Sequence, residues 1–497
     1  MAIRLHNTQS GRVEPFTPSE PGHVRLYVCG PTVYDHAHVG HMRSAVTYDV
    51  LVRHLRARGL RVTFVRNVTD IDDKILKRSV ERGEAPAALA RRYEDAYRED
   101  TRRLGLIEPD CEPRVSEHLD EIRALILRLI GKGAAYESDG DVYFDVPAFP
   151  DYGKLSHRKQ QDLEHGASGR LEDAELQRKR HPADFALWKR AKPGEASWPS
   201  PWSEGHPGWH IECSAMAMRY LGESFDLHGG GLDLVFPHHE NEIAQAEAAT
   251  GKTFAHTWVH NGFIEVNKEK MSKSLGNFMT ARDCFRLAEP EALRYLVYTV
   301  HYRAPLGLDW STDASGQIDA CAQLEEAERR IEYVYRTRAR LAAIPPARIA
   351  DSAAVEPALA EVEERLGAAL DDDLNTPVAL AVTAEFLKQI NELAESAKTK
   401  KGSVGKAAVQ AGVRGFDALA RHLGLGGDDA DALLGRIRAR RAQRAGLRED
   451  EIEQKIAERM QARRDRDFAR ADAIRDEIAA RGIELMDAAD GTDWRIP

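Results

Sequence analysis

The chain has 497 residues, of which 42% are hydrophobic and 30% charged, with a formal net charge of −10. A chain of this length is too long to fold around a single hydrophobic core, so we expect two to four domains. No apolar run approaches the roughly 18 residues of a membrane span, and the first residues lack the apolar core of a secretory signal. These features predict a cytoplasmic protein with no membrane partner, and the net charge argues against general affinity for nucleic acids.

The cysteines do not form a disulfide pattern. There are five, an odd number, and none belongs to a C-x-x-C pair. At this chain length and spacing a disulfide framework is not expected. We predict that Cys111, Cys284 and Cys321 are buried small apolar residues.

The first hundred residues predict a parallel sheet. Val24–Cys29 is typical of a buried strand, apolar periodicity predicts a helix over Met42–Arg58, and Leu60–Val65 is typical of a second strand. A strand, a helix and a strand in this order form a βαβ unit, whose ligands bind at the carboxyl ends of the strands.

The following segments predict an insertion, a return to the sheet and a helical end. Short strands such as Asp141–Asp145 and a Pro/Trp-rich stretch lie between residues 115 and 205. After them we expect, in order, a strand at Ser224–Leu227, a loop at Gly229–Gly231, a helix at His238–Thr250 and a strand near Thr257–Ile264. Beyond residue 310 the chain is rich in Ala, Glu and Arg and predicts helices, and Glu449–Pro497 predicts two helices and a strand-like tail.

The C-terminal region is locally basic. Between Arg436 and Gly482 there are 14 Lys or Arg residues and 10 Asp or Glu residues. This surplus fits either a solvated helix face with ion pairs between successive turns or a surface that faces phosphates.

Two histidines flank the start of the first predicted helix. His38 and His41 surround Gly40, and the positive end of a helix favours phosphate groups. Gly40 would let a nucleotide approach the backbone. Two histidines near a helix start can also serve only as capping or packing residues.

A second element, Lys270–Ser274, offers two ammonium groups and two hydroxyls in a loop that small residues allow to move. Attack at the α-phosphate of ATP needs hydrogen-bond donors on two sides of the developing charge. We assign the ammonium group of Lys273 to the position nearest the phosphorus atom, and we expect the ammonium group of Lys270 to assist it. In this order and spacing, His38–His41 and Lys270–Ser274 resemble the paired signatures of a class I aminoacyl-tRNA synthetase.

Four further residues predict a metal site. Cys29 ends a strand, Cys213 lies far along the chain, and His238 and Glu242 are four residues apart on one helix face. Two thiolates, an imidazole and a carboxylate suit Zn²⁺. Spacing alone leaves other ligands open: His239, Glu240, His210 and His228.

Longer motifs identify the family that the chain resembles. Segments similar to the cysteinyl-tRNA synthetase family are Cys29–Asp35, Val65–Lys74, Asp184–Lys189, Gly208–Ala215, His228–Leu234, Phe236–Glu242 and Asp371–Pro377. The resemblance covers nearly the whole chain. It implies one Zn²⁺, bound by residues matching Cys29, Cys213, His238 and Glu242, which holds the thiolate of the substrate.

The resemblance also implies an α/β fold. A Rossmann-like parallel-sheet catalytic domain with an insertion would precede a helical bundle and a small anticodon-binding domain. The expected ranges are 1–115 and 206–255 for the catalytic domain, 116–205 for the insertion, 256–313 for the region with the Lys270 loop, 314–425 for the bundle and 426–497 for the C-terminal domain.

The implied activity is ATP-dependent ligation of L-cysteine to its tRNA through cysteinyl-adenylate. The resemblance also implies that Mg²⁺ accompanies ATP and that the enzyme is a monomer. Shape alone distinguishes a thiol from a hydroxyl poorly, by roughly 10², whereas zinc prefers a thiolate. No segment resembles a hydrolytic editing domain. By the same resemblance, Thr69 and Trp209 line the amino-acid pocket.

The tail resembles the anticodon-binding domain of the family at Arg463–Asp476 and Gly491–Trp494. An unstacked base requires an aromatic or guanidinium plane and hydrogen-bonding groups at its edge. The residues of these types are Arg463, Phe468, Asp472, Asp487 and Trp494. Helical spacing also fits Phe468 and Ile474 as core residues.

Two alternatives differ in class. The first is a ligase that joins cysteine to an amino sugar in mycothiol synthesis; it lacks the long C-terminal part, which here exceeds 180 residues after Trp310. The second is a non-catalytic relative that binds tRNA or zinc, in which loss of His41 or Lys273 is expected. Both residues are present.

Overall fold

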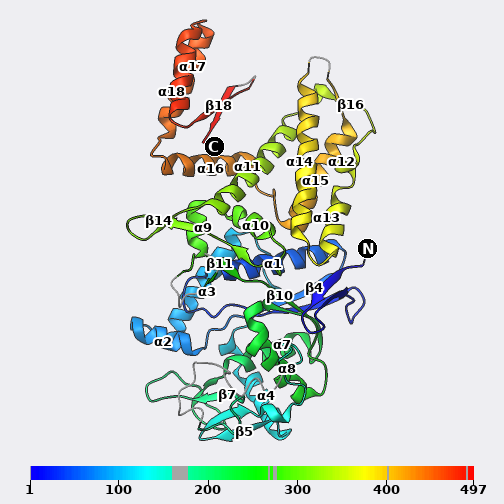
Figure 1. Cartoon of the computed structure of the whole chain (residues 1–497), viewed down its shortest axis with the longest axis vertical. Helices are drawn as coiled ribbons and strands as arrows, with labels where there is room; N and C mark the ends of the chain where they lie inside the picture. The colour runs from blue at the N-terminus through cyan, green and yellow to red at the C-terminus, as the bar shows by residue number, and fades with distance from the viewer. Residues whose placement is uncertain are drawn as a thin grey trace.

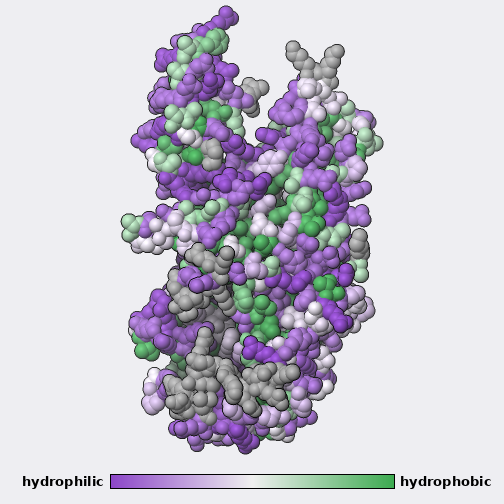
Figure 2. Space-filling model, in the orientation of Figure 1, coloured by the Kyte–Doolittle hydropathy of each residue, from purple (hydrophilic) through white to green (hydrophobic). Residues whose placement is uncertain are grey.

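The computed structural model describes residues 2–158, 177–266, 269–271, 277–399, 402–488 and 491–496. The molecule is elongated (Figure 1). The sheets of the N-terminal half occupy one end, and helices α17 (Glu449–Arg464) and α18 (Phe468–Ala480) form the other. In Figure 2 these two helices form a projection separated by a notch from the helical part beside them, and most of the visible surface is hydrophilic.

A four-stranded parallel sheet forms the centre of the N-terminal half. Its order is β10–β9–β3–β4, with bounds of Ala255–Asn261 for β10, Phe225–Gly231 for β9, His23–Val28 for β3 and Arg61–Arg66 for β4. Helix α1 (Val39–Ala57) connects β3 to β4. The predicted βαβ unit is therefore confirmed, and the carboxyl ends of the four strands meet at one edge.

The prediction of a loop at Gly229–Gly231 is wrong, because these glycines belong to β9. Side chains there would collide with residues packed on the sheet: a Cβ at Gly229 would lie 2.3 Å from the Tyr48 ring. The Tyr48 hydroxyl instead lies 2.8 and 2.7 Å from the carbonyl oxygens of Gly230 and Val259, which share its single hydrogen. A run of glycines thus indicated close packing here rather than a turn.

Two other boundaries differ from the predictions. Helix α8 starts at Glu240 rather than His238 and ends at Thr250, because the preceding turn, Val235–His239, is kinked at Phe236. The segment predicted as one strand near Thr257–Ile264 is divided between β10 and β11 (Ile264–Val266). A hairpin of β1 (Arg4–Asn7) and β2 (Arg12–Pro15) precedes β3 and was not predicted.

An antiparallel sheet with the order β5–β6–β7–β8 lies mainly in the range 116–205 that was predicted as an insertion, and its last strand extends to Pro207. Its strands are β5 (Ala135–Ser138), β6 (Asp141–Phe144), β7 (Phe185–Arg190) and β8 (Gly205–Pro207). The neighbouring helices are α2 (Asp73–Arg82), α3 (Pro86–Arg103), α4 (Leu119–Gly131) and α7 (Trp209–Leu221). Short 3₁₀ turns occur at Val115–Glu117, Val146–Ala148 and Leu232–Leu234.

The second half is mainly helical, as predicted. Its helices are α9 (Ala281–Leu287), α10 (Pro290–Tyr298), α11 (Ala322–Ala342), α12 (Pro357–Ala360), α13 (Val362–Asp371), α14 (Thr376–Lys398), α15 (Lys406–Leu423) and α16 (Ala430–Arg444). Its strands are β12 (Glu269–Lys270), β13 (Leu306–Gly307), β14 (Trp310–Thr312), β15 (Ile318–Cys321), β16 (Ile349–Ala350), β17 (Val404–Gly405), β18 (Glu484–Ala488) and β19 (Gly491–Arg495). Pro346–Arg348 forms a 3₁₀ turn. The predicted tail of two helices and a strand is confirmed, with the strand doubled into the β18–β19 hairpin.

The burial of the three cysteines that were predicted as apolar residues agrees with the prediction for two of them. Cys284 and Cys321 are buried, whereas Cys111 is only half-buried. Among the residues that the structure describes, no helix is long and apolar enough to span a membrane.

Buried polar contacts attach α1 to the helical half. His54 Nε2 lies 2.9 Å from Asp371 Oδ1 of α13, and Arg58 Nη2 lies 2.6 Å from Asp371 Oδ2. His422 of α15 completes the cluster, with its Nδ1 at 3.4 Å from His54 Nδ1. Burial lowers the pKa of His54 to about 4, although Asp371 acts in the opposite direction.

This cluster predicts a loss of stability in mild acid. In the unfolded chain His54 takes up a proton near its ordinary pKa of 6.5, whereas in the folded chain it resists protonation down to about 4. The stabilisation present above pH 6.5 is therefore lost as the pH falls towards 4, by about 3 kcal/mol at most. Thermal unfolding of His54→Gln between pH 7 and 4.5 should show a smaller fall in midpoint than the unsubstituted chain. The matched control is His256→Gln, at an exposed histidine; equal pH slopes for all three proteins would contradict the assignment.

Candidate active site and metal centre

A cavity of about 480 Å³ opens at the carboxyl edge of the parallel sheet. Five of the predicted site residues line it: Cys29, His38, Gly40, His41 and Trp209. Its wall also includes Arg66, Tyr97, Asp233, Asn261 and Met271. The candidate nucleotide element and the candidate metal element, predicted separately, therefore border one space.

The two histidines of the nucleotide element are held by the start of α1. His38 is the N-cap residue, and its backbone N–H donates to His41 Nδ1 at 3.2 Å. The two rings stack with their centroids 3.7 Å apart. Since the first N–H groups of a helix have no partner within the helix, this end of the cavity is electropositive.

The neighbouring His38 ring leaves no room for a side chain at Gly40. A Cβ at this position would lie 2.9 Å from two atoms of the His38 ring and 3.4 Å from Met271 Cε. The His38 ring thus occupies the space that a side chain would need. The expectation of close nucleotide approach at Gly40 stays a prediction.

The segment that follows the predicted Lys270 loop is attached to the histidine element. The Val39 N–H donates to the Met279 carbonyl and the Ala281 N–H to the Ala37 carbonyl, each at 2.9 Å. Lys270 ends β12, and Met271 is buried in the wall of the cavity. Lys273 lies outside the described residues. Backbone pairing therefore brings the segment that contains Met279 and Ala281 to the start of α1.

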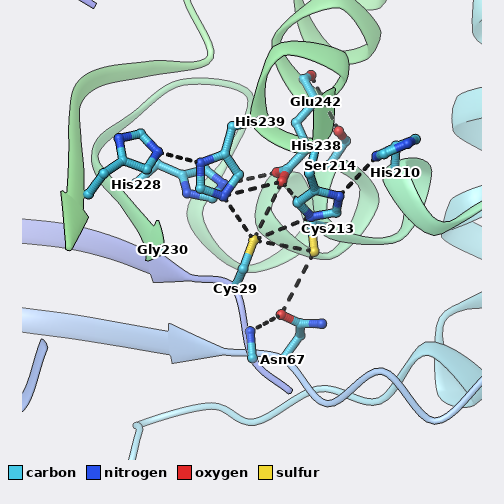
Figure 3. Close-up of polar contacts among 12 residues, drawn as sticks. Cys29, Asn67, His210, Cys213, Ser214, His228, Gly230, His238, His239 and Glu242 are labelled. Carbon is cyan, nitrogen blue, oxygen red and sulfur yellow. Dashed lines mark hydrogen bonds and ion pairs between the residues drawn. The ribbon is translucent and has the colours of Figure 1, made fainter. Parts of the chain in front are cut away.

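The predicted metal ligands come together in one buried cluster (Figure 3). From Cys29 Sγ, the distances are 3.6 Å to Cys213 Sγ, 3.5 Å to His238 Nε2 and 3.5 Å to Glu242 Oε1. His238 Nε2 lies 3.0 Å from Glu242 Oε1. Donor atoms around a tetrahedral zinc ion are separated by roughly 3.3–3.8 Å. Cys29, His238 and Glu242 therefore have nearly the spacing that one such ion requires, and Cys213 Sγ lies at such a distance from Cys29 Sγ.

His239 also belongs to this cluster. Its Nε2 lies 3.3 Å from Cys29 Sγ but 3.9 Å from Glu242 Oε1, and its ligand atom falls within 4.8 Å of those of Cys29, His238 and Glu242. A second-layer partner exists for each imidazole. His238 Nδ1 lies 3.0 Å from His210 Nδ1, and His239 Nδ1 lies 2.7 Å from His260 Nε2. Both imidazoles lie near the spacing of a tetrahedral site, and the assignment of His238 as the ligand stays a prediction.

The charges of the cluster suit a cation. The hydrogen bond from the Cys29 thiol lowers the pKa of Cys213 to about 6. Burial disfavours a charged Glu242, but His228 and His238 outweigh it and lower the pKa of the carboxyl to about 2. Burial raises the pKa of Cys29, and the adjacent Cys213 adds to this effect. A bound cation would reverse the shift at Cys29 by stabilising its thiolate.

Several supporting residues were not assigned from the sequence. Asn67 Oδ1 accepts from the Gly30 N–H at 2.8 Å and lies 3.8 Å from Cys213 Sγ, so it positions the segment after β3. His228 Nε2 lies 2.9 Å from Glu242 Oε2 and orients the carboxylate. Asn67 lies within the Val65–Lys74 motif, whereas the role of His228 required knowledge of the sheet register.

The two predicted pocket residues occupy different positions. Trp209 borders the cavity, and its ring stacks on His238 with a centroid distance of 4.4 Å. Thr69 is buried, and its hydroxyl donates to Glu212 Oε2 at 3.3 Å. Both assignments to the amino-acid pocket stay predictions, and Trp209 has the more direct geometry.

The five residues considered for anticodon contacts form no single exposed surface. Phe468 is 62% exposed at the start of α18. Trp494 is 3% exposed and belongs to the core of the C-terminal part. Asp487 is engaged by Arg459 at 2.7 Å and by Arg463 at 3.1 Å, while Asp472 lies on the exposed face of α18. Phe468 therefore presents the accessible aromatic plane among the five, and its expected role as a core residue is wrong.

The basic surplus of this region has mainly a structural explanation on α16. Its arginines pair with carboxylates on other elements: Arg436 and Arg440 with Glu289, Arg441 with Glu328 and Glu332, Arg444 with Glu325, and Arg438 with Asp493. These pairs join α16 to distant segments rather than linking its own successive turns.

Comparison with known proteins agrees with the fold and the motifs. Residues 15–315 match the family model of the class I (C) tRNA synthetase catalytic domain, and residues 365–425 match the DALR domain. A solved structure of methionyl-tRNA synthetase from Mycobacterium tuberculosis, in complex with methionyl-adenylate, has a TM-score of 0.58 at 16% identity and covers 83% of this chain and 93% of its own.

Sequence relatives match from end to end. The chain is 50% identical over 503 residues to a cysteine–tRNA ligase of Anaeromyxobacter dehalogenans (strain 2CP-C) and 48% identical over 495 residues to one of Syntrophotalea carbinolica. Each alignment covers 100% of both chains. The chain therefore belongs to the cysteine–tRNA ligase family of class I aminoacyl-tRNA synthetases.

Proposed function

We propose that the protein activates L-cysteine with ATP, forming cysteinyl-adenylate and pyrophosphate, and then transfers the cysteinyl group to the 3′-terminal ribose of the cysteine tRNA. The observation that carries this proposal is the shared cavity. Cys29 belongs to the metal cluster and His38 and His41 to the helix start, and all three line one space of about 480 Å³. A thiol bound at one end would present its carboxylate to a nucleotide at the other.

The metal in this proposal is Zn²⁺, with Cys29, Cys213, His238 and Glu242 as its ligands. The donor set of two sulfurs, one nitrogen and one oxygen fits zinc better than a hard cation such as Mg²⁺. Bound there, zinc would accept the substrate thiolate as a further ligand and discriminate against the neutral hydroxyl of serine. His228 and His210 hold Glu242 and His238 in place for this selection.

The nucleotide end stabilises charge rather than transferring protons. His38, His41 and the N–H groups at the start of α1 lie on one side of the cavity, where phosphate is favoured. Lys270 and Lys273 are assigned to the opposite side of the reacting phosphate, with Mg²⁺ accompanying ATP. The backbone pairs Val39–Met279 and Ala37–Ala281 support this assignment, because they hold the segment that follows the loop beside the histidines.

The tRNA would extend from the cavity towards α17 and α18. The exposed Phe468 supports base stacking in this region, with Arg463, Asp472 and Asp487 nearby on the same two helices and hairpin. A base contact by Trp494 has less support, since its ring is buried. The predicted domain ranges, the monomeric state and a cytoplasmic location belong to the same proposal.

The alternatives have weaker support. Relatives named cysteine–tRNA ligase match the whole chain, including the C-terminal part that an amino-sugar ligase lacks. A non-catalytic role conflicts with the retained His38, His41 and Lys273. Cysteine-dependent exchange of pyrophosphate into ATP, followed by charging of cysteine tRNA, tests the proposal. Exchange without charging would favour the amino-sugar reaction, and neither activity would favour the non-catalytic role.

Replacement of Cys213 by serine should release the metal. A neutral hydroxyl is a much poorer zinc ligand than a thiolate, so metal content by mass spectrometry should fall well below one per chain. The KM for cysteine in pyrophosphate exchange should rise at least tenfold. Cys284→Ser, at a buried cysteine outside the cluster, is the matched control. Unchanged metal content in Cys213→Ser would remove this residue from the ligand set.

The neighbouring histidines should differ in their effects. His238→Asn removes the imidazole 3.0 Å from Glu242 and should reduce zinc affinity by orders of magnitude, whereas His239→Asn removes the one at 3.9 Å and should reduce it by about 10–100-fold, as supporting residues do. Competition with a chelator measures both affinities. A larger loss in His239→Asn than in His238→Asn would assign the ligand to His239 instead.

A further inference from the structure

Helix α16 attaches the C-terminal part of the chain to α10 and α11 through a group of ion pairs that we name the α16 joint: Arg436, Arg440 and Arg441 with Glu289, Glu328 and Glu332. Arg436 Nε lies 3.0 Å and Arg440 Nη1 2.6 Å from the two carboxylate oxygens of Glu289. Arg440 also pairs with Glu328. Each of these carboxylates thus meets at least one arginine of α16.

The joint is mainly ionic, and its carboxylates are buried, whereas the Arg436 side chain is 49% exposed. The three carboxylate residues are at most 5% exposed. The fully buried apolar contribution of α16 to the large helical core is limited to Leu433 and Ile437, whereas Ala442 belongs to the separate core of the C-terminal part. Because a buried carboxylate is costly without its partner, the arginines must follow the position of α10 and α11.

Glu289 connects this joint to the catalytic helix. It is the N-cap residue of α10, and its own backbone N–H donates to Glu328 Oε1 at 2.8 Å. Five residues further along the same helix, the fully buried Arg294 pairs with Asp49 of α1 at 2.5 Å. In Figure 1, α10 lies between α16 and α1.

Arg294 has little freedom to move independently of α1. Its guanidinium also donates to the carbonyl groups of Leu104, Gly105 and Leu423, at 2.9, 2.9 and 3.1 Å. Asp49 lies eight residues after His41, about 12 Å along α1. A displacement of α10 must therefore either shift α1, with His38 and His41 at its start, or break a buried ion pair.

We propose that Glu289 is a positioning residue that transmits the position of the C-terminal part, through α10 and the Arg294–Asp49 pair, to the catalytic helix α1. Contact of the anticodon end of the tRNA with the C-terminal part then changes the rate of aminoacyl transfer at the cavity. This inference rests on the proposed function, because it requires cysteine tRNA as the partner. The coupling is carried by packed helices and ion pairs on the described part of the chain, and α10 is its central element.

The test compares two tRNAs on matched variants. Glu289→Gln and Arg436→Gln weaken the joint, and Arg438→Gln removes an ion pair of the same helix to Asp493, within the C-terminal part. Each protein is assayed for single-turnover charging at saturating tRNA, with cysteine tRNA and with the same tRNA carrying three replaced anticodon bases. Cysteine-dependent pyrophosphate exchange without tRNA and the thermal midpoint are measured alongside.

We expect Glu289→Gln and Arg436→Gln to charge intact tRNA about fivefold or more slowly, to charge the altered tRNA at nearly the unsubstituted rate, and to retain exchange within about twofold. Arg438→Gln should charge the intact tRNA faster than the altered tRNA by the same factor as the unsubstituted protein does. If a substitution slows charging of both tRNAs by the same factor, or slows neither, the inference is overturned. A fall in pyrophosphate exchange parallel to the fall in charging would also overturn it, because it indicates a general structural role. No exchange in the unsubstituted protein would instead contradict the proposed function.

Discussion

The convergence of two sulfur atoms at the carboxyl edge of the parallel sheet is the constraint on which the rest of the site depends. Cys29 follows β3 and Cys213 lies on α7, yet their sulfurs are 3.6 Å apart. Glu242 already pairs with His228 and His238, and a cation bound beside the two sulfurs would stabilise their thiolate forms. The sheet register, the glycines of β9 and the kinked turn before α8 all serve this convergence.

Helix α1 belongs both to the wall of the cavity and to the contacts that attach the helical half. Its first turn places His38 and His41 at the cavity, and its later turns bind the helical half through Asp49 and His54. A catalytic helix held at both ends can respond to events at distant elements. The buried and charged character of these contacts matters here, because such pairs have a defined geometry and are costly to break.

Much of this arrangement could be predicted from the sequence because it depends on local patterns. Apolar periodicity located α1 and its flanking strands, and the motifs around Cys29, Cys213 and Glu242 identified the family. The predictions failed where tertiary packing determined the outcome. Gly229–Gly231 became strand because Tyr48 packs against it.

The C-terminal part shows the same limit. Composition alone could not separate a surface that faces phosphates from a structural network, since the partners of the α16 arginines lie more than 100 residues away at Glu289 and Glu328. The spacing of Phe468 fitted a core position, but the structure exposes its ring. The partners of residues that are distant in sequence, and the side to which a helix face is turned, can be determined only from the folded structure.

X-ray absorption spectroscopy at the zinc edge, on the purified protein before and after addition of cysteine, tests whether zinc joins the two sulfur atoms and binds the substrate thiolate. We expect one zinc ion per chain with two sulfur ligands at about 2.3 Å, and a third sulfur when cysteine binds. Serine should leave the sulfur number unchanged. A fully active protein without zinc, or a sulfur number that stays at two with saturating cysteine, would contradict the account.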